Sequence, residues 1–230
     1  MSPPRTVSSL LFCYVLFGLL FLPSLNAQEL PIGYISYYQN SCKTMSFINS
    51  LEIKDASSWK LSKYGATIIS PLHPDSIKEG FPENKGFLQS MILGEYILEF
   101  EFRVIDADSA AGSGFCLLSP AKSCDTYYVF SMGNDSLRFY YVDKGHSTLL
   151  NSKKLETDVG AWTNVRVERD ILKRKVSLTL TGKESQKISF IDRRLVMGYL
   201  GFGTQNVNSA IRNVRLWAPT AIQDEIIECE

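Results

Sequence analysis

Residues 96–105 read YILEFEFRVI, and this stretch decides the fold class. Apolar side chains occupy every second position: Leu98, Phe100, Phe102 and Val104. The positions between them are charged: Glu99, Glu101 and Arg103. Successive side chains of a strand point to opposite faces of its sheet, so this period of two predicts a strand with one buried face and one solvated face.

Similar short runs follow at intervals of roughly 8–12 residues, the spacing typical of β-sandwiches. They are Gly114–Leu118, Tyr127–Met132, Leu137–Val142, Thr148–Lys153, Trp162–Arg169, Lys175–Thr181, Lys187–Ile191, Tyr199–Gly203 and Ala210–Trp217, after the shorter Trp59–Leu61, Ala66–Ile69 and Gly86–Met91. Separators such as Asp143-Lys144-Gly145 contain residues that accept positive φ in turns. The pattern predicts an all-β fold, a two-sheet antiparallel β-sandwich.

The N-terminus predicts a secretory signal peptide over residues 1–27. Arg5 supplies a positive charge, Leu10–Leu22 is an unbroken apolar run, and Ala27 is a small residue suited to cleavage. The run is shorter than the about 20 apolar residues that a stable transmembrane helix needs. We therefore expect an extracellular or periplasmic protein with no stable membrane anchor after cleavage. The rest divides into an N-terminal extension (28–50), the sandwich (51–218) and an acidic tail (219–230).

Removing Cys13 with the signal peptide leaves four cysteines: Cys42, Cys116, Cys124 and Cys229. An even number in an oxidising compartment favours disulfides, and four cysteines allow three pairings. We favour Cys116 with Cys124, which closes a short loop, and Cys42 with Cys229, which ties together the two ends of the domain. A zinc site is disfavoured because the chain has no Cys-x-x-Cys pair and only two histidines, His73 and His146.

The net charge is zero, from 24 basic and 24 acidic side chains. This balance argues against a nucleic-acid partner, because phosphate binding needs a concentrated positive field. The basic cluster Lys173-Arg174-Lys175 lies between two predicted strands and indicates a solvated hairpin turn. Sandwiches can hold a structural calcium ion, but no acidic loop here is dense enough to assign its ligands, and we predict no cofactor.

Glu99 and Glu101 are the candidate catalytic residues. They share one face of a strand, where two carboxyl groups could divide the acid and base roles of glycoside hydrolysis. The Glu-x-Asp-x-x-Glu pattern of laminarinase-type hydrolases is absent. The same charges also fit a solvent-facing strand that pairs with basic neighbours, so both interpretations stay open.

Aromatic side chains concentrate on neighbouring predicted strands, and such rings stack well on sugars. From these we select Tyr128 and Tyr141, together with Arg103 and Arg166, as candidate ligand-binding residues. The alternative is a core position, since one ring of an adjacent pair such as Tyr140-Tyr141 must face the interior.

Several segments together resemble a known group. They are Ser113-Gly114-Phe115, GAWTNVRV at 160–167, GYLGFG at 198–203 and IRNVRLW at 211–217. Over about residues 51–217 the chain resembles the concanavalin A-like jelly-roll proteins, and particularly the secreted 3-keto-disaccharide hydrolase domain family. Glycan-binding laminin G-like modules share the Trp162 strand and the closing strand. The chain departs from the hydrolase family at 203–206, where Gly-Thr-Gln-Asn replaces Leu-Gln-x-His-Gly.

The resemblance implies a concanavalin A-like jelly roll that acts on carbohydrate. Our leading hypothesis is a secreted carbohydrate-binding β-sandwich whose partner is a glycan. The first alternative is a glycoside hydrolase or lyase of the 3-keto-disaccharide type, with Glu101 as the first candidate acid or base. The second is a structural or adhesive module without a small ligand.

Overall fold

The computed structural model describes residues 30–63, 65–70, 82, 84–89, 93–106, 112–122, 125–133, 136–155, 160–181, 185–205 and 207–219, and for residues 106, 112–117 and 133 it describes the backbone alone. The predicted signal peptide and nearly all of the acidic tail lie outside this part of the chain. Within it, no helix is long and apolar enough to cross a membrane.

Antiparallel strands within the unit Gly33–Glu230 form three sheets. The eight-stranded sheet has the order β13 (Gln186–Ile191), β12 (Lys175–Thr181), β11 (Thr163–Asp170), β6 (Tyr96–Asp106), β15 (Asn208–Ala218), β4 (Thr67–Ile69) and β3 (Trp59–Leu61), with β1 (Ile35–Asn40) paired to β15. The four-stranded sheet has the order β10 (His146–Lys154), β9 (Ser136–Asp143), β8 (Tyr127–Gly133) and β7 (Gly112–Leu118). The third sheet contains β14 (Gly201–Thr204), β5 (Asn84–Leu88) and β2 (Leu51–Ile53).

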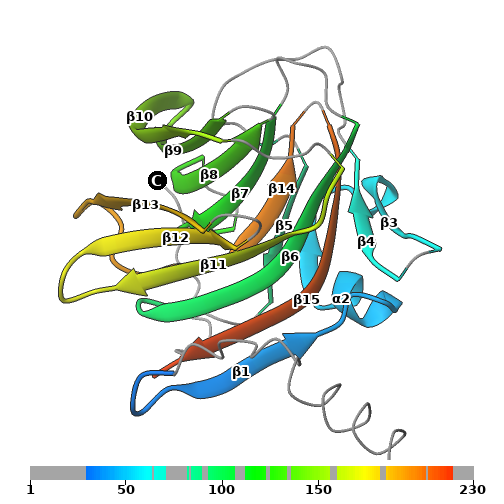
Figure 1. The fold of residues 1–230 in the computed structure, drawn as a ribbon, viewed down its shortest axis with the longest axis horizontal. Helices are drawn as coiled ribbons and strands as arrows, with labels where there is room; N and C mark the ends of the chain where they lie inside the picture. The colour runs from blue at the N-terminus through cyan, green and yellow to red at the C-terminus, as the bar shows by residue number, and fades with distance from the viewer. Residues whose placement is uncertain are drawn as a thin grey trace, which may run out of the picture. The chain divides into compact units, whose positions relative to one another are not determined.

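The two smaller sheets lie side by side through β7 and β14, and together they form the layer opposite the eight-stranded sheet (Figure 1). The main core fills the space between the layers. The predicted fold class, a two-sheet antiparallel β-sandwich, is confirmed.

Strand β6 shows why the sandwich forms. Its side chains Leu98, Phe100, Phe102 and Val104 are each at most 8% exposed and belong to the core. The charged residues between them lie on the other face of the sheet, as the alternation predicts. Removing one such core phenylalanine would cost about 3–5 kcal/mol, so the inward half of this strand supplies much of its stability.

The other predicted strands are found with ends that shift by a few residues. The predicted turn at Asp143-Lys144-Gly145 joins β9 to β10, and Lys144 and Gly145 have φ values of 45° and 82°. Two successive positive φ values are those of the tight hairpin turn that matches the twist of paired strands. The basic cluster at 173–175 likewise lies at the hairpin between β11 and β12.

The structure includes part of the predicted N-terminal extension in the sandwich. Strand β1 pairs with β15 from Ile35 to Asn40, and the short helix α2 (Met45–Asn49) buries Phe47 and Ile48 in the core. The boundary predicted at residue 51 therefore falls inside the folded unit. The run 35–40 has no clear alternation of apolar and polar residues, because β1 lies at the edge of its sheet.

A second, smaller apolar cluster packs on the outward side of the four-stranded sheet and its neighbour, and it consists of Phe87, Tyr127, Val129, Tyr140, Val142 and Tyr199. In the pairs Tyr127-Tyr128 and Tyr140-Tyr141, the first ring joins this cluster and the second packs in or against the main core. Lys85 and Lys122 lie over the rings of Tyr127 and Tyr199, at 4.5 and 4.6 Å from the ring centres. Both rings of such a pair are therefore used in packing.

Among the described cysteines, Cys42 is a free thiol with an exposed fraction of 0%. Burial raises the pKa of this thiol to about 12. The favoured pairing with Cys229 is thus not found, because Cys42 packs into the core instead of reaching the surface. Cys124, Cys229 and the side chain of Cys116 lie outside the described part of the chain, so the Cys116–Cys124 pairing stays a prediction.

Candidate functional site

The outward side chains of β6, β11 and β15 form a charged surface on the eight-stranded sheet, which we call the polar face. Its residues on these strands are Glu99, Glu101, Arg103, Arg166, Glu168, Arg212, Asn213 and Arg215, and Trp162, directly before β11, joins them through Arg212. Strand β6 runs between β11 and β15, so its acidic residues have basic neighbours on both sides. The four residues predicted from β6 and β11, Glu99, Glu101, Arg103 and Arg166, therefore come together on one face.

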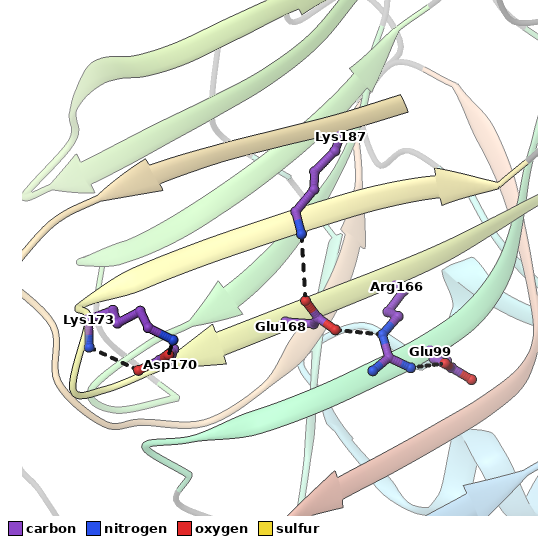
Figure 2. A network of polar contacts seen from close by, with 6 residues as sticks. All are labelled: Glu99, Arg166, Glu168, Asp170, Lys173 and Lys187. Carbon is purple, nitrogen blue, oxygen red and sulfur yellow. Dashed lines mark hydrogen bonds and ion pairs between the residues drawn. The ribbon is translucent and has the colours of Figure 1, made fainter. Parts of the chain in front are cut away.

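A chain of ion pairs crosses this face from β6 to β13. Arg166 donates through Nη1 to Glu99 at 2.6 Å and through Nε to Glu168 at 2.8 Å. Lys187 lies 3.9 Å from the second oxygen of Glu168 (Figure 2). Arg215 of β15 reaches the other oxygen of Glu99 at 2.9 Å. Each carboxylate of this network thus already has two cationic partners.

Glu101 is held by an irregularity in β15. The pairing of β15 with β6 shifts between Arg212 and Arg215, and Asn213 has a φ of 55°. Such a bulge lets two neighbouring side chains approach the same group. Arg212 donates through Nε to Glu101 at 2.7 Å, and Asn213 donates to the other carboxylate oxygen. Both oxygens of Glu101 are therefore occupied by donors from one strand.

One end of the polar face carries an indole ring and an incompletely bonded arginine. The Trp162 ring is partly exposed, and the Arg212 guanidinium lies 4.1 Å from its centre. Arg103 is the charged residue of β6 at this end of the polar face. Its Nε is buried without a hydrogen-bond partner among the described residues. We call Trp162, Arg103, Glu101, Arg212 and Asn213 the tryptophan patch.

These contacts favour binding over acid–base chemistry on the polar face. A general acid must deliver a proton to the substrate, and a general base must point an available oxygen at it. The oxygens of Glu99 and Glu101 instead accept hydrogen bonds from arginine and asparagine side chains. A cavity of about 390 Å³ is present in the structure, but neither glutamate lines it, nor does Arg103 or Arg166.

The two predicted tyrosines do not lie on the polar face. Tyr128 and Tyr141 belong to β8 and β9 of the opposite layer, with ring centres 5.6 Å apart. Tyr128 is fully buried, whereas Tyr141 is partly exposed with the Arg194 guanidinium 3.9 Å from its ring centre. The predicted ligand-binding set is therefore divided between two layers, because period-two patterns show which residues share a strand face but not which sheet the strand joins.

Tyr128 and Arg194 meet at Asp192, just after β13. The Tyr128 hydroxyl donates to one carboxylate oxygen of Asp192, and Arg194 donates to both oxygens through its side chain. Burial opposes the charge of Asp192, but hydrogen bonds from Arg194 and Tyr128 outweigh it and lower the pKa to about 2. Burial and the bond to Asp192 raise the pKa of the Tyr128 hydroxyl above its ordinary value. This network connects the two layers at one edge of the sandwich.

Sequence reasoning did not select Trp162 as a site residue, and it missed the other members of these networks: Glu168, Lys187, Asp192, Arg194, Arg212, Asn213 and Arg215. A signal for the bulge was present, because the buried residues of the closing strand are spaced by three at Ile211–Val214 and by two at Val214–Leu216. No comparable pattern marks Asp192, whose partners come from distant parts of the chain. Within the described residues, no group of three or more His, Cys, Asp or Glu side chains is placed to hold a metal ion.

The fold belongs to a widely used class, the concanavalin A-like jelly roll. A carbohydrate-binding module, CBM66 from Bacillus subtilis, superposes with a TM-score of 0.58 at 13% identity, covering 74% of this chain and 96% of the module. A seed lectin of Lotus tetragonolobus gives a TM-score of 0.57 at 11% identity, covering 84% of this chain and all of the lectin.

A GH43 protein, BlXynB of Bacillus licheniformis, gives a TM-score of 0.58 at 11% identity, and the match covers 78% of this chain but only 39% of that protein. No family model and no curated protein matches the chain in sequence. At identities this low the similarity establishes the fold, and function must be argued from the residues.

Proposed function

We propose that the chain is an exported carbohydrate-binding protein that holds saccharides on the tryptophan patch of the polar face. Export rests on the signal peptide predicted over residues 1–27. Carbohydrate binding rests on one observation: a partly exposed indole has the Arg212 guanidinium over one face, and Arg212 and Asn213 hold Glu101 with hydrogen bonds, which leaves the other face of the indole for a sugar ring. The C–H face of a sugar packs on an aromatic ring, and its hydroxyls require donors and acceptors at the rim.

A buried donor of Arg103 supports the tryptophan patch as the binding site. Its buried Nε has no partner among the described residues, so a sugar hydroxyl or ring oxygen there would supply a missing acceptor. Its guanidinium also approaches Gly160, where an added Cβ would lie 3.9 Å from Nη2.

The names of the structural neighbours support the same function. CBM66 is called a carbohydrate-binding module, and an acidic lectin of winged bean with a TM-score of 0.52 was solved in complex with methyl-α-D-galactose. These proteins show that the fold can carry saccharide sites. The proposal for this chain rests on its own residues.

A screen of the purified protein against a glycan array tests the proposal. We expect at least one saccharide to bind, and Trp162→Ala to weaken that binding by about tenfold through lost ring contact. Trp217→Ala is the matched control. Trp217 is also partly exposed, and the Arg215 guanidinium lies 5.5 Å from the centre of its ring, outside the tryptophan patch. The control should bind as the parent does.

Two results would overturn the proposal in different ways. Equal weakening by both tryptophan variants would remove the tryptophan patch as the site. Absence of any saccharide binder would remove carbohydrate binding and leave a structural or adhesive module. Incubation of a bound saccharide with the protein also tests the 3-keto-disaccharide hydrolase or lyase that the sequence resemblance implies, since cleavage that is lost in Glu101→Gln would support it.

A further inference from the structure

A second, separate feature of the fold is a cavity of about 390 Å³ between the β11–β12 hairpin and the segment after β13. Three arginines line it: Arg169, Arg174 and Arg193. We call it the arginine cavity. Its volume lies in the range of roughly 300–1,000 Å³ usual for small-molecule sites, so it has room for more than a bare ion.

Arg169 is the unusual member of this group. Its side chain is 3% exposed, and among the described residues its Nε and Nη1 have no hydrogen-bond partner. Only Nη2 is bonded, to the backbone carbonyl oxygens of Leu195 and Val196. The Tyr128 ring, 5.9 Å away, contacts the charge but offers no acceptor for the unbonded N–H groups. A buried guanidinium with open donors is costly unless an acceptor meets it.

The single carboxylate that lines the cavity does not meet this need. Asp192 accepts hydrogen bonds from Arg194 and from the Tyr128 hydroxyl, as described above. Arg174 and Arg193 are exposed, and they add positive charge at the mouth. The lining therefore carries three positive charges against one negative charge whose oxygens are already in use.

The mouth of the cavity is also apolar. Leu172 and Val196 line it with exposed fractions of 92% and 54%. Apolar side chains this exposed, next to a cluster of arginines, are suited to a ligand that has both an anionic group and an apolar surface.

We propose that the arginine cavity binds an oxyanion, a carboxylate or sulfate group, with Nη1 of Arg169 donating to one oxygen and the exposed Arg174 and Arg193 pairing with the others. Guanidinium groups bind carboxylate and sulfate oxygens through charge-assisted hydrogen bonds, which are stronger than hydrogen bonds between neutral groups. The oxyanion could belong to an acidic sugar or to a free inorganic anion. The first source is consistent with the proposed glycan function, but the cavity site does not depend on it.

Calorimetric titration of the purified protein at fixed ionic strength tests this, with sodium glucuronate, sodium sulfate and glucose as probes. We expect saturable binding of at least one anion and none of glucose in the cavity. Stronger binding of glucuronate than of sulfate identifies an acidic sugar, and the reverse order identifies a free anion.

Arg169→Met should weaken anion binding by at least about tenfold, since it removes the buried positive charge and one charge-assisted hydrogen bond and keeps an unbranched side chain. Because Arg169 is buried, its substitution could disturb folding. A second variant, Arg174→Ala combined with Arg193→Ala, changes only exposed residues and avoids this problem. It should also weaken binding, whereas Lys60→Ala on β3, an exposed cation in another strand, should not. Amide resonances of Leu172 and Val196 should shift on titration in the parent protein.

The proposal is overturned if neither anion binds, or if the double variant binds the anions as tightly as the parent does. Either result leaves the tryptophan patch untouched, because that test uses array saccharides and Trp162. Conversely, a chain that binds no array saccharide could still bind sulfate through Arg169, so the two proposals fail separately.

Discussion

The polar face and the arginine cavity both contain arginine and acidic side chains. The acidic side chains of the polar face are paired with cations, whereas positive charge is in excess in the cavity. On the polar face Glu99, Glu101 and Glu168 each meet two donor side chains, and the charges lie in register across neighbouring strands. In the arginine cavity three arginines line the wall, and the one carboxylate that lines it, Asp192, is already bonded to Arg194. Paired charges on a sheet surface need no ligand to explain them, whereas a buried unbonded donor favours one, as at Arg169 in the cavity and at Arg103 in the tryptophan patch.

The largest effect that tests this comparison is expected at Arg166. Its side chain is 10% exposed and bridges two glutamates, so Arg166→Met would remove the most buried partner of both carboxylates and cost about 2 kcal/mol of unfolding free energy. Urea denaturation measures this value. The control is Arg215→Met, which removes the other partner of Glu99 from a side chain that is 51% exposed and should cost less than about 0.5 kcal/mol. Equal losses of unfolding free energy in the two variants would show that burial does not determine how much these ion pairs contribute to stability.

A smaller effect is expected from acid at Asp192, beside the cavity. Its pKa is about 2 in the fold against an ordinary value of 3.8, so the folded protein binds this proton less readily than the unfolded chain does. The stabilisation is complete above the ordinary pKa and is lost as pH falls from about 4 to 2. Solvent on the open side of Asp192 limits it to about 1 kcal/mol.

Asp192→Asn should reduce this part of the acid dependence in thermal melts recorded between pH 2 and 5. Tyr128→Phe removes one donor to Asp192 and should reduce it in part. An Asp192→Asn variant with the acid dependence of the parent would show that other carboxylates dominate in this range.

The smallest effect is expected at the hairpin cluster that the sequence marks as basic. Lys173 is 75% exposed, and its ion pair with Asp170 at 2.7 Å lies in solvent (Figure 2). Lys173→Ala should leave the melting temperature unchanged within error, since exposed pairs contribute little. Asp170→Ala should lower it slightly, because this carboxylate also accepts the backbone N–H of Lys173 in the turn. A clear fall in the melting temperature of Lys173→Ala would contradict the small contribution to stability expected of an exposed ion pair.

Much of the fold could be predicted from local patterns. The alternation in 96–105 placed the inward and outward residues of β6 correctly, because a strand in a two-layer sandwich has one face in the core and one in solvent. The short α2 and the edge strand β1 could not be predicted in this way. Phe47 and Ile48 of α2 are buried by contacts with distant strands, which five helical residues cannot signal.

The candidate site was predictable only in part, for a related reason. Glu99, Glu101 and Arg103 share a face by the period of two, which is a local property of β6. Arg166 joined them because β11 pairs beside β6, and Arg212, Asn213 and Arg215 joined them because β15 returns along its other side with a bulge. Tyr128 and Tyr141 were separated from this set because their strands entered the other layer.

The amino-acid sequence by itself determined the all-β class, the strands, the turns and the faces on which charges lie, since these follow from backbone geometry and the period of side-chain direction. It also carries the predicted signal peptide. Only the tertiary structure decided which strands became neighbours, which charges were paired, and that Arg169 was buried beside a cavity with two donors unbonded. Those outcomes depend on long-range packing, in which residues distant in the chain compete for the same partners.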